Sequence, residues 1–370
     1  KAFYNDNEIG SFKFSYVTMA GKGTESDPYV IMTPEHFDSI RDDLDAYYVL
    51  GADLDFSEDT GPGGKFANEA SYCPGKYLGW KAINGFSGSL DGQGHSIKGL
   101  YQNNYISCWK DNDLYTQYAV TGNGIFNKLI NNVTIKNLVL EDNYIGCAEF
   151  NDNKNCGLLA SYYLANNGDF NDKTVYSGNF ENLVFRNNSV IGAGSSISSG
   201  GLFGYFSSPL GNITFKNMYI YDNKIASESE FLKEVSSLVD TIDADNLEVS
   251  NIRIDGTHIG KYNDGSGDAV LGYKLYGYNN LKINNILSTM SGENIGGNLF
   301  YEALYRDNVD INGINMFRIG NNQDNLCNSY DKDCNNAGTN VNIFDKDTGL
   351  KELVKKENYS SWENFDENWV

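Results

Sequence analysis

Two short stretches of the sequence place an aspartate near a histidine, residue types that could serve acid–base chemistry on a sugar. They are DGQGHSI, with Asp91 and His95, and RIDGTHIG, with Asp255 and His258. A polygalacturonase-like site would also need several clustered aspartates on neighbouring strands and a basic pair. The five arginines are spread along the chain. We therefore interpret the first stretch as a tight turn between strands and keep a polysaccharide-cleaving enzyme, lyase or glycoside hydrolase, as the alternative.

Metal chemistry has one candidate, a loop with oxygen-bearing side chains at alternate positions. Asp331, Asp333 and Asn335 have the spacing of a calcium loop, but the glutamate at its twelfth position is missing. A solvated loop is the favoured interpretation, so we expect no metal and no cofactor. The sequence also contains no HExxH, no G-x-S-x-G and no phosphate-binding Gly–Lys loop. We accordingly expect no catalytic residues.

Aromatic residues in two polar stretches are the stronger functional signal. Tyrosine and tryptophan give a large rigid contact area and stack on sugar faces, and loops of a rigid scaffold often carry recognition. We expect insertions near 101–118 and 151–176 to bind a ligand; in the competing interpretation these rings fold back over the flank of the protein. The candidates are Tyr101, Tyr105, Trp109, Tyr115, Tyr118, Tyr162, Tyr163, Phe170 and Tyr176.

The cysteines favour disulfides over a metal site. No pair has CxxC spacing and the chain has only 3 histidines, so zinc is disfavoured. Neighbour spacing favours three pairs, although six cysteines allow 15 pairings. Disulfides indicate an oxidising compartment. The favoured pairs are Cys73 with Cys108, Cys147 with Cys156, and Cys327 with Cys334.

An internal repeat indicates how these residues are positioned. The pattern Asn, apolar, any, apolar, any, Asn or Gly, apolar begins at Asn132 and recurs from Asn212 onward with starts 34, 34, 28 and 32 residues apart. Another apolar segment precedes each copy and a third follows it. Three short strands that recur in this way cannot bury a face alone, but stacked units can. This predicts a parallel β-helix in which the repeated asparagines form a ladder or left-handed corners.

The ends of the chain differ from its middle. Thr33-Pro34 and the apolar spacing after it predict a short helix near 33–46 that covers the first coil. A second short helix is expected from about Thr348, followed by a plug of Trp362, Phe365 and Trp369. The predicted organisation is entry strands at 1–32, a capping helix and first strand at 33–60, the β-helix at 61–345, and a C-terminal cap at 346–370.

Composition excludes several classes of protein. Acidic side chains number 49 and basic ones 28, which gives a net charge of −21. Such a surface repels phosphate backbones and anionic lipids and disfavours acidic polysaccharides, so we expect no nucleic-acid partner. No apolar run approaches the roughly 20 residues of a membrane helix, so we expect no direct membrane insertion by this segment.

Several stretches resemble the β-helix segments of bacterial surface proteins of the GLUG-motif type, found in adhesins and autotransporter passengers. They are 21–57, LGWKAI at 78–83, FSGSLDGQGHSIKGL at 86–100, SGGLFGYF at 199–206 and YSSWENFDENW at 359–369. In several repeats Ser, Asn or Ala replaces a glycine of the motif. The resemblance implies a right-handed coil, and the crossover preference of parallel strands agrees.

The fold class expected from repeat and resemblance together is all-β, a single-stranded right-handed parallel β-helix with three short strands per coil. The expected function is non-enzymatic. It is that of an adhesin-like domain, extracellular or on the bacterial outer surface, that binds a host cell-surface protein or glycan and belongs to a longer surface protein. A structural stalk is the second alternative.

Overall fold

The computed structural model describes residues 2–4, 7–10, 18–110, 113–118, 122–148, 155–167, 169, 171–193, 198–227, 235–260, 268–291, 298–305, 309–317, 338–344, 355 and 357. Several predictions lie outside these residues: Phe170, the Cys327–Cys334 pair, the calcium candidates Asp331, Asp333 and Asn335, and nearly all of the cap at 346–370.

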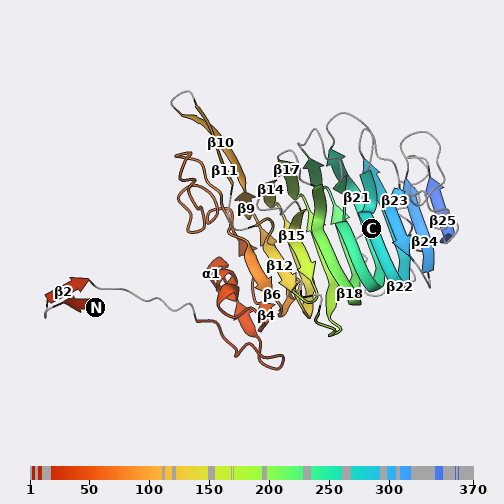
Figure 1. The fold of residues 1–370 in the computed structure, drawn as a ribbon, viewed down its shortest axis with the longest axis horizontal. Coiled ribbons are helices and arrows are strands. Elements are labelled where there is room, and N and C mark those ends of the chain that lie inside the picture. The colour runs from red at the N-terminus through yellow and green to blue at the C-terminus, as the bar shows by residue number, and fades with distance from the viewer. Residues whose placement is uncertain are drawn as a thin grey trace.

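One large, curled parallel sheet dominates the described chain (Figure 1). Successive turns of the backbone lay strands beside those of the preceding turn, an arrangement consistent with a parallel β-helix. The parallel pairing begins at β3, before residue 61, where the β-helix was predicted to start. The strands are β3 (Tyr29–Ile31), β4 (Tyr47–Leu50), β5 (Leu54–Asp55), β6 (Ile83–Phe86), β7 (Ser89–Asp91), β8 (Ser96–Lys98), β9 (Tyr101–Asn103), β12 (Phe126–Ile130), β13 (Val133–Glu141), β14 (Tyr144–Ala148), β15 (Asn155–Leu164), β16 (Ser177–Arg186), β17 (Ser189–Ala193), β18 (Ser198–Tyr221), β19 (Lys224–Ser227), β20 (Val235–Ser236), β21 (Val239–Gly260), β22 (Asp268–Ser291), β23 (Asn298–Tyr305), β24 (Val309–Phe317) and β25 (Gly338–Phe344).

The register of this sheet follows the sequence repeat. Asn212 pairs with Asn246, and Asn246 pairs with Asn280, which reproduces the step of 34 residues. The last copy differs from the prediction, because Ile314 pairs with Val341, only 27 residues later. The segment after Asn340 lacks the second asparagine of the motif, and its alternating apolar residues fit the following strand position equally well.

Apolar ladders fill the interior of the coil. One ladder stacks Ile135, Phe180, Phe215 and Val249 from successive strands, all fully buried. The rings of Phe180 and Phe215 stack with centroids 5.3 Å apart. Each strand therefore depends on its neighbours for burial, as expected for a repeat protein.

The second asparagine of the motif forms both structures that the sequence predicts, a ladder and a left-handed corner. Asn137, Asn182, Asn217, Asn251 and Asn285 all have φ between 53° and 57°. Each of the last four donates its Nδ2 to the Oδ1 of the preceding member at 2.7–2.9 Å. Asparagine suits this position because it tolerates the left-handed region and its amide can donate and accept at once.

A second asparagine ladder is buried inside the coil. Asn143, Asn188 and Asn223 are each 1% exposed. The Asn188 Nδ2 donates to Asn223 Oδ1 at 2.9 Å, and the Asn143 Nδ2 donates to Asn188 Oδ1 at 3.0 Å. Main-chain groups complete these bonds, so the ladder satisfies polar atoms at the turns that follow β13 and β16.

The N-terminal helix confirms its sequence signals. Helix α1 (Pro34–Asp38) continues into the 3-10 helix η1 (Ser39–Asp42), and Thr33 caps it by accepting from the His36 main chain. Phe37 and Ile40 are fully buried and belong to the main core. The helical segment therefore contributes its apolar side to the first coils, but it ends at Asp42, four residues short of the predicted end at 46.

The turn between β7 and β8 gives a prediction on pH. Asp53 accepts from the Ser96 main chain at 2.8 Å and lies 3.2 Å from His95 Nδ1, and the first of these bonds lowers the pKa of Asp53. A lowered pKa stabilises the folded state above the unfolded value near 3.8, and this stabilisation is lost as the pH falls through the folded pKa. The Asp53→Asn variant should therefore have a lower urea midpoint than wild type at pH 6, and the two midpoints should converge as the pH falls through the lowered pKa of Asp53. A difference that stays constant with pH would contradict this.

Candidate ligand-binding hairpin

One antiparallel hairpin leaves the parallel sheet and projects beyond it (Figure 1). It consists of β10 (Tyr105–Lys110) and β11 (Asp113–Tyr118), with Tyr105 opposite Tyr118 and Trp109 opposite Leu114. Antiparallel pairing at this point takes the chain out of the coil. The insertion predicted at 101–118 therefore starts at Tyr105 and is a strand ribbon rather than an irregular loop, whereas Tyr101–Asn103 belong to β9 of the parallel sheet.

One face of the hairpin is fastened to the segment before β6. Ile106 packs with Ala70 and Cys73 in a small buried cluster that is separate from the main core. Cys73 and Cys108 form a disulfide with Cα atoms 5.8 Å apart, one of the predicted pairs. Side chains alternate along a strand, so this face holds the even-numbered residues of β10 and leaves the other face outward.

The outward face carries large apolar side chains at its tip. Trp109 is 74% exposed and Leu114, directly across the hairpin, is 56% exposed. Tyr72, next to the disulfide in the sequence, is 63% exposed. Its carbonyl oxygen lies 3.5 Å from the Cys108 sulfur, so the disulfide holds its segment against the hairpin. Exposed aromatic surface of this kind is typical of interaction sites.

A buried amide network fixes the base of the hairpin. Gln102 donates to the Trp80 carbonyl at 2.9 Å and accepts from the Gly124 main chain at 2.7 Å. Asn104 donates to Asn123 Oδ1 at 2.8 Å, and both side chains are buried. These bonds join the strands on either side of the insertion, so the hairpin starts from a fixed point on the sheet.

Three other predicted aromatics lie nearer to the sheet than expected. The Tyr101 ring stacks on Tyr144 of the next turn, 5.3 Å between centroids. Tyr105 and Tyr176 are half-buried and pack against the main core. Tyr115 and Tyr118 belong to β11 by their backbone, and their side chains lie outside the described part. Among the predicted candidates whose side chains the structure describes, Trp109 is the strongly exposed one.

Tyr163 is corrected from a ligand-binding candidate to a core residue. It is fully buried, and its hydroxyl donates to the Asn131 carbonyl at 2.9 Å. Tyr162 is its neighbour in β15, where it faces Tyr205 with ring centroids 6.4 Å apart. The segment Gly157–Tyr163 belongs to a strand of the parallel sheet and not to an insertion, because it pairs in parallel with β18.

The second disulfide lies inside the coil. Cys147 and Cys156 form a bond across the break between β14 and β15, and both are fully buried. This is another of the predicted pairs. Two disulfides favour an oxidising compartment and a non-cytoplasmic protein.

Charged side chains on the outer face of the sheet pair acid with base in successive strands. Lys98 lies 3.0 Å from Asp55, Lys136 lies 3.5 Å from Asp91, and Arg186 contacts Glu141. Asp91 is thus held by Lys136 and by the Asn137 amide, in keeping with the structural interpretation of its motif. In the part of the chain that the structure describes, no three His, Cys, Asp or Glu side chains are grouped to hold a metal ion. Within that same part, no helix is long and apolar enough to span a membrane.

Comparisons with known proteins are sparse. No family model matches the chain. A protein of Evansella cellulosilytica named "Putative Gly-rich membrane protein" is 29% identical over 141 residues, which cover 35% of this chain and 13% of that relative. The crystal structure of a "putative immunoglobulin A1 protease" from Bacteroides ovatus aligns with a TM-score of 0.41 at 16% identity, covering 78% of this chain and 86% of the other.

Proposed function

We propose that this chain is a β-helical domain of a bacterial surface or secreted protein and that it binds a host cell-surface protein or glycan through the β10–β11 hairpin. The coil would be right-handed, as the crossover preference of parallel strands favours, with three strands per turn, as the sequence repeat predicts. The domain would act without catalysis, as part of a longer surface protein.

The observation that carries the proposal is the placement of Trp109 and Leu114. Both are large apolar side chains on one face of a ribbon that extends from the sheet, and both are mainly exposed. A disulfide and a buried cluster hold the opposite face. The tip is thus presented without a large loss of chain entropy on binding, which favours affinity.

The test is binding of the labelled domain to cultured epithelial cells, with the double variant Trp109→Ser/Leu114→Ser beside wild type. Hot-spot aromatics contribute about 2 kcal/mol or more, so we expect the variant to bind at least about 30-fold more weakly. Circular dichroism should be unchanged, because neither side chain packs in a core.

The matched control is Val175→Ser/Leu210→Ser. These residues are 61% and 44% exposed, and they belong to other turns of the chain, Val175 just before β16 and Leu210 within β18. It should bind like wild type. Saturable binding that survives the hairpin substitutions, or that both double variants lose equally, would disprove the role of the hairpin. No saturable binding by wild type would disprove adhesion by this domain and leave the stalk or the polysaccharide-cleaving enzyme.

A further inference from the structure

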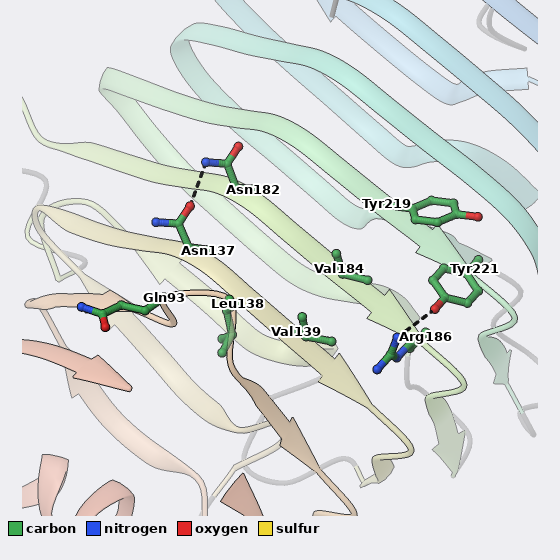
Figure 2. A pocket seen from close by; sticks show the side chains of 10 residues that line it. Gln93, Asn137, Leu138, Val139, Asn182, Val184, Arg186, Tyr219 and Tyr221 are labelled. Carbon is green, nitrogen blue, oxygen red and sulfur yellow. Dashed lines mark hydrogen bonds between the residues drawn. The ribbon is translucent and has the colours of Figure 1, made fainter. Parts of the chain in front are cut away.

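A groove of about 720 Å³ crosses the outer face of the sheet, apart from the hairpin (Figure 2). Consecutive turns of the chain build it. Gln93 and Gly94 come from the turn before β8, Val139 from β13, Val184 from β16 and Tyr219 with Tyr221 from β18. The groove therefore runs along the stacking axis and not along any one strand.

Its floor is an apolar stripe. Val139 pairs with Val184, and Val184 pairs with Tyr219 in the same column of outward side chains. All three are half-buried. Neighbouring strands are about 4.8 Å apart, so the stripe extends for about 10 Å across the coils.

One edge of the floor carries amides with unused bonding capacity. Asn137 donates to Asp91 Oδ1 and accepts from Asn182 Nδ2, both at 2.9 Å, and Asn182 accepts from Asn217 at 2.9 Å. A primary amide has two N–H donors and two acceptor lone pairs, so the ladder occupies one of each. The side chains of Asn137 and Asn182 are half-buried at the rim of the groove (Figure 2), where the second donor and second lone pair can serve a ligand.

The far end of the groove is aromatic and held in place. The Tyr219 and Tyr221 rings stack with centroids 4.5 Å apart, and the Arg253 guanidinium lies 4.8 Å from the Tyr219 ring centroid. Arg186 donates to the Tyr221 hydroxyl at 3.3 Å and contacts Glu141, which offsets its charge. The end wall thus keeps its shape before any ligand arrives.

The backbone around the groove excludes a peptide that adds as a strand. β13 pairs with β8 on one side and β16 on the other, and β16 pairs with β13 and β18. No strand edge is open at this place, so a ligand can be held only by side chains.

We propose that this groove binds a neutral oligosaccharide lying along the stacking axis. A sugar presents C–H faces to valine and tyrosine and hydroxyl groups to the asparagine amides. The net charge of −21 opposes acidic sugars. The groove does not include residues of the hairpin, so this proposal is tested independently of the proposed role of the hairpin.

The test is a glycan array of short neutral oligosaccharides, with sialylated and uronate-containing glycans and extended peptides beside them, followed by calorimetry with the best neutral binder. Tyr221→Ala should weaken binding about tenfold through loss of the end wall. Val184→Glu should abolish it, because a longer charged side chain fills the floor.

Two control variants make the outcome decisive. Val175→Glu puts the same charge on an exposed valine outside the groove, and Trp109→Ser alters the hairpin. Both should bind the array ligand like wild type. The proposal fails if folded wild type binds no neutral glycan, binds only acidic glycans or peptides, or if Val175→Glu weakens binding as much as Val184→Glu.

Discussion

Replacing Asn188 with leucine is expected to destabilise the middle of the coil by about 3–5 kcal/mol, since each buried polar group left unpaired costs about 1–3 kcal/mol. Asn188 Oδ1 accepts from both the main chain and the Nδ2 of Asn143, and its own Nδ2 donates to the Leu140 carbonyl at 2.9 Å. Leucine has a similar shape but removes these bonds inside a site that is 1% exposed. Water cannot reach the atoms left behind.

The measurement is amide hydrogen exchange in β13 and β16, with urea unfolding beside it. Exchange is the better readout because turns of a repeat protein can open locally. The control is Asn212→Ala on the half-buried outer column, where Asn212 donates to Ser177 Oγ at 3.1 Å and accepts from Asn246 Nδ2 at 2.9 Å. Water can replace both bonds at this half-buried site, so the control should cost under about 1 kcal/mol. Equal protection in the two variants would show that the buried ladder is not a main source of stability.

Most of the features of the fold that could be predicted from the sequence followed from the internal repeat. Its period sets which residues stack, so the step of 34 residues and the asparagine corners were available from the sequence. The N-cap at Thr33 is a local signal, whereas the pairing of Cys73 with Cys108 was predicted by matching each cysteine with its neighbour in the sequence. The register of the last copy was predicted wrongly because this copy, which contains Val341, lacks the second asparagine of the motif.

The site was less predictable because exposure depends on which face of a strand is fastened. Tyr162 and Tyr163 are adjacent and equally suited to binding by type, yet alternation sends Tyr163 inward. Trp109 and Leu114 point outward because the disulfide fixes the opposite face of β10. Tyr72 was missed, although its place beside Cys73 becomes informative once that cysteine is paired with Cys108.

Removing the outer disulfide with Cys73→Ser/Cys108→Ser is expected to disorder the hairpin and leave the coil folded. The bond spans 35 residues, and in the chain-entropy model closing a loop of that length contributes about 4 kcal/mol. The effect should be local, because Cys73 belongs to a small cluster apart from the main core. Amides of β10 should lose exchange protection, and cell binding should fall to the level of the Trp109→Ser/Leu114→Ser variant.

The inner disulfide provides the matched comparison. Cys147 and Cys156 are buried in the main core and close a span of only 9 residues, which contributes about 3 kcal/mol in the same model. Cys147→Ser/Cys156→Ser should therefore lower the urea midpoint of the coil while β10 stays protected relative to its neighbours. If β10 keeps its protection without the Cys73–Cys108 bond, the cluster around Ile106 alone orders the hairpin. The exposure of Trp109 at the tip of the hairpin would then not depend on an oxidising environment.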